Sequence, residues 1–367
     1  MMEEWLSCAL LYHGIWYTRE YVRKGLPASS GIENDLFRFL EEWFTPYPFL
    51  TVQTSGSTGM PKKLVIKKKQ MMNSALNTCS FLHLQRGNRA LLCMPLRYIA
   101  GKMVVVRALV CSMELLLSEP SGHPMASLQE GIDFAALVPL QVFNSLQNPQ
   151  EKEELKHIKK LIIGGGAIDE EIENQLKSFP NPIYSSYGMT ETLSHIALRP
   201  INGPSPSKSY IPFQNVTLSI SDEQTLIIDA PDVCDERLHT NDVVQIHEDK
   251  TFTVIGRKDN IINTGGIKIQ IESVESAIRP LVGEKFAITA IPDPKFGEKI
   301  VLLVEKREEE DTLGLKKKLE QVLPKYQLPK LIYPVSCIPM TGNGKICRPE
   351  CRKLAESISK GNDANEN

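Results

Sequence analysis

Short apolar runs alternate with longer amphipathic segments from about residue 50 to residue 190. FLTVQT, RALLCMPL and DFAALVP have the length of strands, whereas KKQMMNSALNTCSFLHL and IDEEIENQLKSF place apolar residues at helical spacing. MVVVRALVCS fits either a helix or a buried strand. Alternation of strands and helices predicts a mainly parallel sheet with helices on its faces. Before it, YVRKGL and NDLFRFLEEWF predict a short helical prelude over residues 1–50.

The pattern changes beyond residue 210. VTLSISDEQTLIIDA and VVQIHEDKTFTVIG alternate over short distances and predict antiparallel strands, and a compact α+β module follows GRKDN. We therefore expect an α/β protein. A large N-terminal domain of layered sheets and helices would span residues 1–256, with a hinge at 257–259. A small mobile α+β C-terminal domain would span 260–358, followed by a polar, disordered tail at 359–367.

Composition agrees with two globular domains and adds one constraint. A chain of 367 residues exceeds the size at which a single hydrophobic core usually keeps growing. Its net charge is only −2, with 42 basic and 44 acidic residues, so there is no global electrostatic case for a nucleic-acid partner or an anionic membrane. Any anion-binding ability must be local.

Cysteine usage and the N-terminal residues predict a cytoplasmic protein. The eight cysteines include no CxxC pair, and nothing resembles the disulfide framework of a short secreted chain. The N-terminal residues MMEEWLSCALLYHG are acidic where a signal peptide is basic. Arg107 and Glu114 interrupt the longest apolar stretches, so no integral membrane segment is expected. The oligomeric state stays open, a homodimer included.

The segment TSGSTGMPKK, residues 54–63, lies between a predicted strand and a predicted helix. Its glycine backbone N–H groups and its hydroxyl groups can converge on a phosphate, with Lys62 as counter-charge. It is not the GxxxxGK[ST] loop, because Met60 and Pro61 follow Gly59. Taken alone, its composition equally fits a solvent-exposed linker.

Four further motifs follow in a fixed order: SSYGMTETLSH (Ser185–His195), HTNDVV (His239–Val244), GRKDNIINTGGIKI (Gly256–Ile269) and TGNGK (Thr341–Lys345). Together with TSGSTGMPKK, they resemble the adenylate-forming superfamily of acyl-CoA synthetases, luciferases and peptide-synthetase adenylation domains. That superfamily has [ST]SG[ST]TGxPK, YGxTE, a TGD-type segment, GRxDxxI with a following GG, and a C-terminal GK. The resemblance covers the chain from about residue 50 to residue 350.

The resemblance implies a two-step ligase that uses ATP, Mg²⁺ and coenzyme A. A carboxylate attacks the α-phosphate to give an acyl-adenylate, and a thiol then displaces AMP; catalysis rests mostly on positioning and charge stabilisation. Catalytic roles are implied for Lys345, Thr190 and Glu191, with Glu191 also the magnesium ligand. Nucleotide binding is implied for Thr54, Ser55, Gly56, Ser57, Thr58, Gly59, Lys62, Gly164, Gly165, Gly166, Ala167, Tyr187, Gly188, Asp242 and Arg257.

Members of the superfamily rotate the small domain between the two steps. The resemblance makes Asp259 the hinge and places Gly265 and Gly266 along the thiol tunnel. One departure is Asn241, which stands where the superfamily prefers glycine; asparagine is the next-best residue for a turn with positive φ. Each residue alone has an ordinary alternative. Tyr187 could be core, Asp242 a turn residue, and Lys345 a solvated lysine.

Within the superfamily, the chain is most similar to the o-succinylbenzoate–CoA ligases of menaquinone synthesis. The resemblance rests on the early position of the first motif, on MPLRYIAGKMVVVRAL (94–109) and on ALVPLQVFNSL (136–146). Tyr98 replaces the usual histidine and Leu140 the usual threonine. No carrier-protein segment with its serine is present, which favours free coenzyme A as the acceptor.

Such an acid has a second carboxylate, which needs a cationic or hydrogen-bonding partner because an unpaired buried carboxylate is costly. Substrate contacts are assigned to Arg107, Ser194 and His195, with Arg97 and Lys102 as further candidates. A salt bridge at a helix surface equally explains either arginine, and His195 could instead face solvent. Another aryl- or fatty-acyl-CoA ligase, or a binding protein of this fold without catalysis, remains an alternative function.

Overall fold

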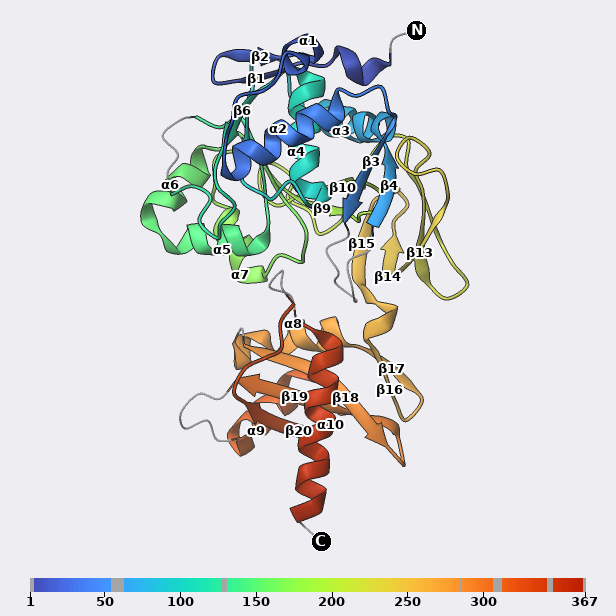
Figure 1. Ribbon diagram of the computed structural model, residues 1–367. Helices are drawn as coiled ribbons and strands as arrows, with labels where there is room; N and C mark the ends of the chain where they lie inside the picture. The colour runs from blue at the N-terminus through green and yellow to red at the C-terminus, as the bar shows by residue number, and fades with distance from the viewer. Residues whose placement is uncertain are drawn as a thin grey trace. The chain divides into compact units, whose positions relative to one another are not determined.

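The computed structural model describes residues 3–53, 63–126, 131–283, 285–305, 312–341 and 346–365 (Figure 1). It divides into two compact units. The larger consists of Met1–Ser219, Ile227–Leu238 and Ile246–Thr253, and the smaller of Ile220–Leu226, His239–Gln245 and Val254–Asn367.

The largest sheet belongs to the larger unit and has the order β11-β10-β9-β8-β7-β5-β6-β1-β2. Its strands from β9 to β1 in that order run parallel to their neighbours, whereas β2, β10 and β11 pair antiparallel. The strands are β1 (Leu10–Tyr12), β2 (Ile15–Tyr17), β5 (Arg89–Leu92), β6 (Glu114–Leu117), β7 (Phe134–Leu137), β8 (Lys160–Ile163), β9 (Ile183–Gly188), β10 (His195–Pro200) and β11 (Ile211–Pro212).

The carboxyl ends of three neighbouring parallel strands carry the predicted site segments. Val138 follows β7, the segment Gly164–Ala167 follows β8, and Tyr187 and Gly188 end β9. Because β7, β8 and β9 are adjacent and parallel, these segments meet at one edge of the sheet, where ligands of open α/β sheets bind.

The helices of the larger unit cover this sheet, and α4 is the most deeply buried of them. Every residue from Gly101 to Leu109 of α4 is buried, as expected of a helix packed between α3 and strands β5 and β6. A side chain at Gly101 would lie 2.6 Å from the carbonyl oxygen of Pro95, so only glycine fits there. The helices are α1 (Arg19–Arg23), α2 (Gly31–Trp43), α3 (Lys68–Leu82), α4 (Ile99–Cys111), α5 (Pro139–Gln147), α6 (Pro149–His157) and α7 (Glu170–Leu176), with the 3₁₀ helix η1 (Glu4–Ser7).

Two smaller antiparallel sheets complete the first 257 residues. β3 and β4 pair with Gln53 opposite Lys63, so the segment 54–62 connects their ends. The order of the other sheet is β12-β13-β14-β15, as the alternating pattern predicts. The strands are β3 (Phe49–Gln53), β4 (Lys63–Lys67), β12 (Thr217–Ile220), β13 (Thr225–Asp229), β14 (Leu238–Ile246) and β15 (Phe252–Arg257).

The smaller unit contains a sheet of order β17-β16-β19-β18, with β20 parallel to β19. Alternate residues of β18 point to opposite faces: Phe286 and Ile288 pack with α8 and α9, whereas Ala287 and Ile291 pack with α10. Both faces are therefore covered. The elements are η2 (Lys258–Asn260), β16 (Ile261–Thr264), β17 (Ile267–Gln270), α8 (Ile271–Val282), β18 (Phe286–Asp293), β19 (Gly297–Glu305), α9 (Thr312–Val322), β20 (Leu331–Val335) and α10 (Arg348–Asn365).

Two predictions for the ends of the chain differ from the structure. The prelude is not purely helical, because β1 and β2 form a hairpin that extends the main sheet through the pairing of β1 with β6. The tail expected to be disordered from residue 359 is helical as far as Asn365, where it continues α10. The MVVVRALVCS segment, open between helix and strand, is helical in α4.

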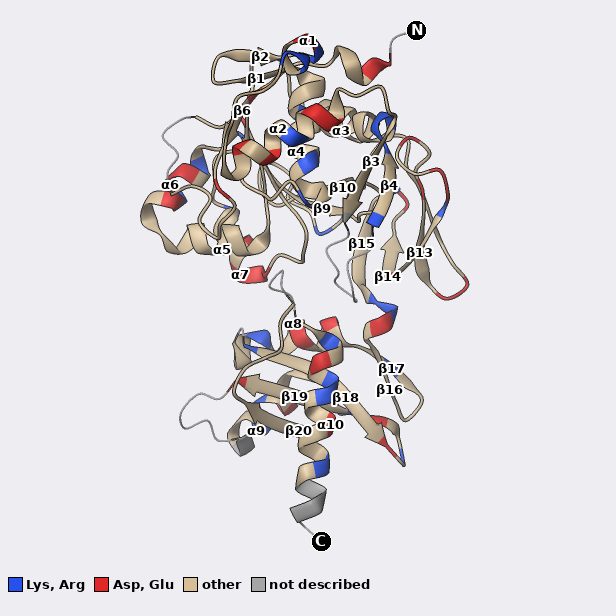
Figure 2. Ribbon diagram, in the orientation of Figure 1, with Lys and Arg blue, Asp and Glu red and all other residues tan. Residues whose placement is uncertain are grey.

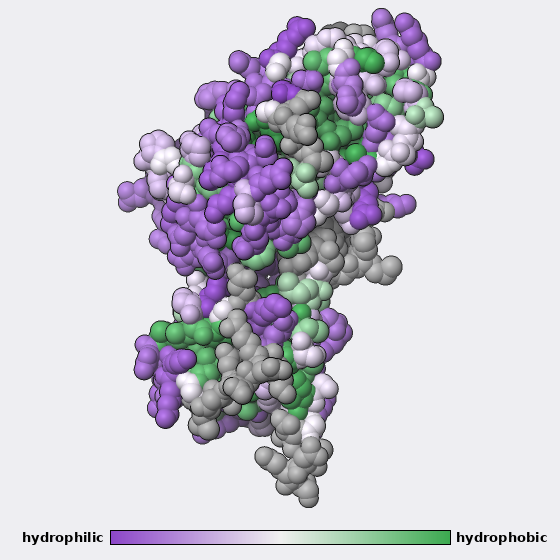
Figure 3. All heavy atoms as spheres, turned by 90° about the vertical axis from the view of Figure 1, so that its left-hand side faces the viewer, coloured by the Kyte–Doolittle hydropathy of each residue, from purple (hydrophilic) through white to green (hydrophobic). Residues whose placement is uncertain are grey.

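Charges of both signs are interspersed over the helices of both units (Figure 2), in keeping with the near-zero net charge. Hydrophilic side chains cover much of the face shown in Figure 3. Among the described residues, no helix has both the length and the apolar character needed to cross a membrane.

Candidate active site

Part of the predicted site lies outside the described residues: Thr54, Ser55, Gly56, Ser57, Thr58, Gly59, Lys62 and Lys345. The other candidates fall into three groups. The first lies at the carboxyl ends of β8 and β9, the second joins α4 to the start of β10, and the third lies in the smaller unit.

The glycine segment after β8 is tightly packed against β9. A side chain at Gly164 would collide with the hydroxyl of Ser186, and Gly165 has a φ of +80°. Gly164 also donates its N–H to the carbonyl of Leu137 at 2.9 Å, at the end of β7. This turn therefore needs glycine for its own geometry, and it exposes backbone close to Ser186 of β9.

Tyr187 is held by two aromatic neighbours. Its ring meets Phe252 edge-on, at 5.1 Å between centroids and 81° between planes, and lies 5.8 Å from the ring of Tyr210. Tyr210 and Phe252 stack on each other. Tyr187 nevertheless stays partly exposed. A rigid, partly exposed ring at a sheet edge suits contact with a planar base.

The turn after β9 is fixed from within by Thr192. The buried Thr192 hydroxyl accepts from the N–H of Met189 at 3.0 Å and lies 2.7 Å from the carbonyl oxygen of Ser194. This arrangement leaves Thr190 partly exposed and Glu191 exposed. A carboxylate oxygen is the ligand that Mg²⁺ prefers, and Mg²⁺ commonly uses one or two carboxylates while keeping several waters. Glu191 therefore fits the predicted magnesium role.

Gly188 brings the start of β10 close to the end of β9. It lies opposite His195 in the antiparallel pair, and a side chain at Gly188 would lie 2.8 Å from the carbonyl carbon of Ser194. Only glycine allows the two backbones to approach in this way. Ser194 and His195 are thereby held beside the strand that carries Tyr187.

Arg107 of α4 is a buried cation whose partner is neutral. Its side chain is 2% exposed, and its Nη2 donates to the Oγ of Ser194 at 2.6 Å. Its Nε has no hydrogen-bond partner among the described residues, and no described carboxylate forms an ion pair with it. Burial lowers the pKa of Arg107 to about 10. The salt bridge at a helix surface, which the sequence left open for this residue, is not what the described residues form.

His195 lies in the same cluster and is buried, so it does not face solvent. Its Nδ1 is 3.3 Å from the Oγ of Ser194, and its Nε2 is 3.0 Å from the Oγ1 of Thr78. Burial and then the charge of Arg107 hold the pKa of His195 well below its ordinary value. The imidazole is therefore neutral at physiological pH.

The two further candidates have contacts elsewhere. Lys102 pairs with Glu42 of α2 at 3.6 Å and lies over the ring of Phe39. Arg97 is exposed and lies over the ring of Tyr98.

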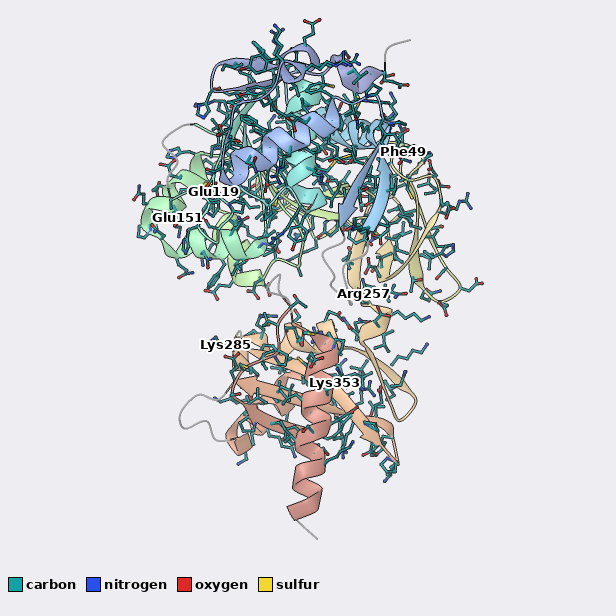
Figure 4. The ribbon with its side chains drawn as sticks, in the orientation of Figure 1. Phe49, Glu119, Glu151, Arg257, Lys285 and Lys353 are labelled. Atoms are coloured by element: carbon teal, nitrogen blue, oxygen red, sulfur yellow. The ribbon has the colours of Figure 1, made fainter. Side chains whose placement is uncertain are left out.

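The third group is a set of charged and amide side chains around Arg257, which is labelled in Figure 4. Arg257 donates to the carboxylates of Asp242 at 3.1 Å and of Asp259 at 2.8 Å. Asp259 also accepts from the side chain of Asn241. The predicted ribose ligands and the predicted hinge are thus parts of one hydrogen-bond network.

Gly265 and Gly266 form the turn between β16 and β17, where Thr264 pairs with Ile267. Their φ angles are +58° and +81°. A two-residue hairpin turn with both φ angles positive favours glycine, so this pair has a local reason to be glycine apart from any thiol tunnel.

Sequence reasoning missed Thr78, Tyr210 and Phe252, because none of them belongs to a motif. It noted Asn241 but assigned it only a turn. The structure instead places Asn241 within β14, and it is not among the residues with positive φ.

A model of the AMP-binding enzyme family matches residues 48–233, half of the chain. The chain belongs to this family. This AMP-binding enzyme is similar to a solved acyl-CoA synthetase (AMP-forming)/AMP-acid ligase II-like protein from Dyadobacter fermentans, with 32% identity and a TM-score of 0.63. The alignment covers 91% of this chain and 97% of that one.

Two further relatives bear the name of one acid. The 2-succinylbenzoate–CoA ligase of Listeria monocytogenes serotype 4b is 25% identical over 337 residues, which cover 86% of this AMP-binding enzyme and 72% of the relative. The o-succinylbenzoate CoA synthetase of Bacillus subtilis, solved with the acyl-adenylate intermediate OSB-AMP, shares the fold. Its TM-score is 0.70 at 20% identity, over 82% of this chain and 68% of that one. The predicted family and α/β fold are confirmed.

Proposed function

We propose that this chain is an AMP-forming acid–CoA ligase that activates o-succinylbenzoate with ATP and transfers the acyl group to coenzyme A. Membership of the AMP-binding family and the relatives that carry this activity in their names support the proposal. The resemblance to o-succinylbenzoate–CoA ligases implies that the product is used in menaquinone synthesis.

The observation that carries the choice of acid is the state of Arg107. A buried guanidinium without a carboxylate partner is costly, since a neutral hydrogen-bond partner and the ring of Phe134, 6.0 Å away, offset the desolvation of the charge only in part. Within the described residues, Arg107 has only the neutral hydroxyl of Ser194 at hydrogen-bond distance. An acid with a second carboxylate would supply the missing charge, whereas a fatty acid would not.

The remaining candidates divide the other tasks. Tyr187 would contact adenine beside the Gly164–Ala167 backbone, and Asp242 with Arg257 would bind the ribose. Glu191 would hold a magnesium ion that neutralises phosphate charge, with Thr190 near the α-phosphate. Outside the described residues, Thr54–Lys62 would contact the terminal phosphates, and Lys345 would stabilise the charge that develops at the α-phosphate.

The test is ATP–pyrophosphate exchange with a panel of acids: o-succinylbenzoate, 4-oxo-4-phenylbutanoate, benzoate and laurate. 4-Oxo-4-phenylbutanoate is the matched control, because it keeps the succinyl arm and lacks only the carboxylate on the ring. We expect exchange with o-succinylbenzoate and much less with the others. Exchange with benzoate or laurate alone would exclude the proposed acid, and no exchange with any acid would exclude adenylation by this chain.

The acceptor and the assembly belong to the same proposal. Free coenzyme A is the proposed acceptor and the cytoplasm the proposed location. Thioester formation is followed by chromatography of the CoA product. The oligomeric state, a homodimer included, is measured by light scattering of the purified protein.

A further inference from the structure

Thr78 lies outside every motif, yet it contacts the cluster of Arg107, Ser194 and His195 that is proposed to bind the acid. It belongs to α3 and is fully buried. Its Oγ1 is 3.0 Å from the Nε2 of His195 and 3.1 Å from the carbonyl oxygen of Ser74, one helical turn earlier. A chain of hydrogen bonds therefore runs from α4 through the start of β10 to α3.

The direction of this chain follows from its two ends. Arg107 can only donate, so the Oγ of Ser194 accepts from its Nη2. The carbonyl of Ser74 can only accept, and the hydroxyl of Thr78 lies 3.1 Å from it in donor geometry, so we place the hydroxyl hydrogen of Thr78 on this carbonyl. If Thr78 donated to His195 instead, two oxygen lone pairs would face each other at 3.1 Å.

The protonation of the imidazole follows from the same argument. Because the hydrogen of Thr78 is used on Ser74, the Nε2 of His195 must carry a hydrogen and donate it to Thr78. A neutral imidazole has one donor nitrogen and one acceptor nitrogen, so Nδ1 then accepts from the hydroxyl of Ser194.

We propose that Thr78 is a positioning residue that fixes His195 as its Nε2–H tautomer and so orients Ser194 as an acceptor for Arg107. The inference rests on the proposed function, because it assigns the cluster to recognition of a carboxylate. Thr78 itself need not touch the acid. It acts through His195. Because the hydrogen-bonded side chains are already ordered, binding of the acid carries a smaller entropic cost.

The arrangement also determines the net charge of the side chains proposed to bind the carboxylate. His195 is neutral and buried, so Arg107 carries the one positive charge within this hydrogen-bond chain. One cation matches one carboxylate. A charged imidazole beside the guanidinium would bring two like charges together in a buried site, which is unfavourable.

The experiment compares Thr78→Val, which keeps the shape and removes the hydroxyl, with Thr78→Ser, which keeps the hydroxyl. The tautomer of His195 is measured by long-range ¹H–¹⁵N NMR of protein labelled at histidine nitrogen, without any acid, and His195→Gln assigns the signal. We expect the Nε2–H tautomer in the wild type and in Thr78→Ser. In Thr78→Val, we expect the hydrogen to move to Nδ1, where Ser194 can still accept it.

Kinetics supply the second readout. Thr78→Val should raise KM for o-succinylbenzoate roughly 10-fold with KM for ATP unchanged, and Thr78→Ser should restore the wild-type value. If Thr78→Val does not fold, Thr78→Ala is measured in the same way. An Nδ1–H tautomer in the wild type, or an unchanged tautomer in the variants without the hydroxyl, overturns the inference. The expected tautomers without activation of any acid would leave the positioning role intact and overturn the proposed function.

Discussion

The side-chain amide of Asn241 donates to both carboxylate oxygens of Asp259, at 3.1 Å each. Glycine, the residue that the superfamily pattern has at this position, could not make this contact. The difference from the pattern is therefore a gain of two hydrogen bonds to the proposed hinge, and not a turn that merely tolerates a side chain. Arg257 binds the same carboxylate, so the hinge is held from two sides.

Replacing Asn241 by glycine should loosen the segment Lys258–Asn260. We take the two hydrogen bonds to the carboxylate to contribute about 1.4 kcal/mol together. Their loss should then increase the local opening equilibrium roughly 10-fold. Hydrogen–deuterium exchange of these backbone amides measures it. Asn241→Asp is the matched control, since a second carboxylate repels Asp259 and should raise exchange further. Unchanged exchange in both variants would show that the contact does not restrain the hinge.

Arg107→Met should separate recognition of the acid from stability. Loss of a charge-assisted contact should reduce kcat/KM for o-succinylbenzoate by roughly 10- to 100-fold. It should hardly change the value for 4-oxo-4-phenylbutanoate, which lacks the ring carboxylate. The melting temperature should not fall, because an apolar side chain replaces a buried cation that has no described carboxylate partner. An equal loss for both acids would contradict the assigned role.

His195 should make the protein less stable at acidic pH. In the folded state its pKa lies well below the ordinary value of 6.5, mainly through burial and also through Arg107. Below pH 6.5 the unfolded chain therefore binds a proton that the folded chain does not, and stability falls as the pH drops. The slope from this residue is at most about 1.4 kcal/mol per pH unit. Urea unfolding between pH 7.5 and pH 5 should show this share in the wild type and not in His195→Gln.

Gly266→Asn should distinguish a turn from a thiol tunnel. Asparagine tolerates positive φ, and a side chain at this position has no atom of the structure within 4 Å, so the turn should form. If the tunnel assignment holds, adenylate formation should persist while thioester formation from supplied acyl-adenylate is lost. Lys345→Ala should show the opposite pattern. If both half-reactions of Gly266→Asn keep their wild-type rates, the thiol-tunnel assignment is wrong and the glycine pair has only a structural role in the turn.

The sequence predicted those parts of the fold in which local pattern and tertiary packing agree. The α+β module expected after GRKDN contains β18 and β19, and both faces of their sheet are covered. The hairpin of β1 and β2 was missed because its strands are short and their pairing with β6 joins residues far apart in sequence. The helical end of α10 was missed because a polar composition was taken as disorder.

The candidate site was predictable where a residue belongs to a motif and hidden where its role depends on a distant partner. Tyr187, Glu191 and Asp242 became candidates because their motifs resemble those of the superfamily. Nothing in the sequence pairs Thr78 with His195, because 117 positions separate them. Only the packing of α3 beside α4 and the start of β10 brings this hydroxyl to the imidazole.

The short connection between β9 and β10 limits how the acid specificity of such an enzyme can change by mutation. Tyr187, proposed for the nucleotide, and His195, proposed for the acid, lie on paired strands, with Gly188 directly opposite His195. An insertion or a bulky residue here would displace the nucleotide end and the acid end together. In this hairpin, a change of acid specificity can therefore use amino-acid substitutions but not insertions or deletions. Larger changes in the shape of the acid pocket must come from helices such as α3 and α4.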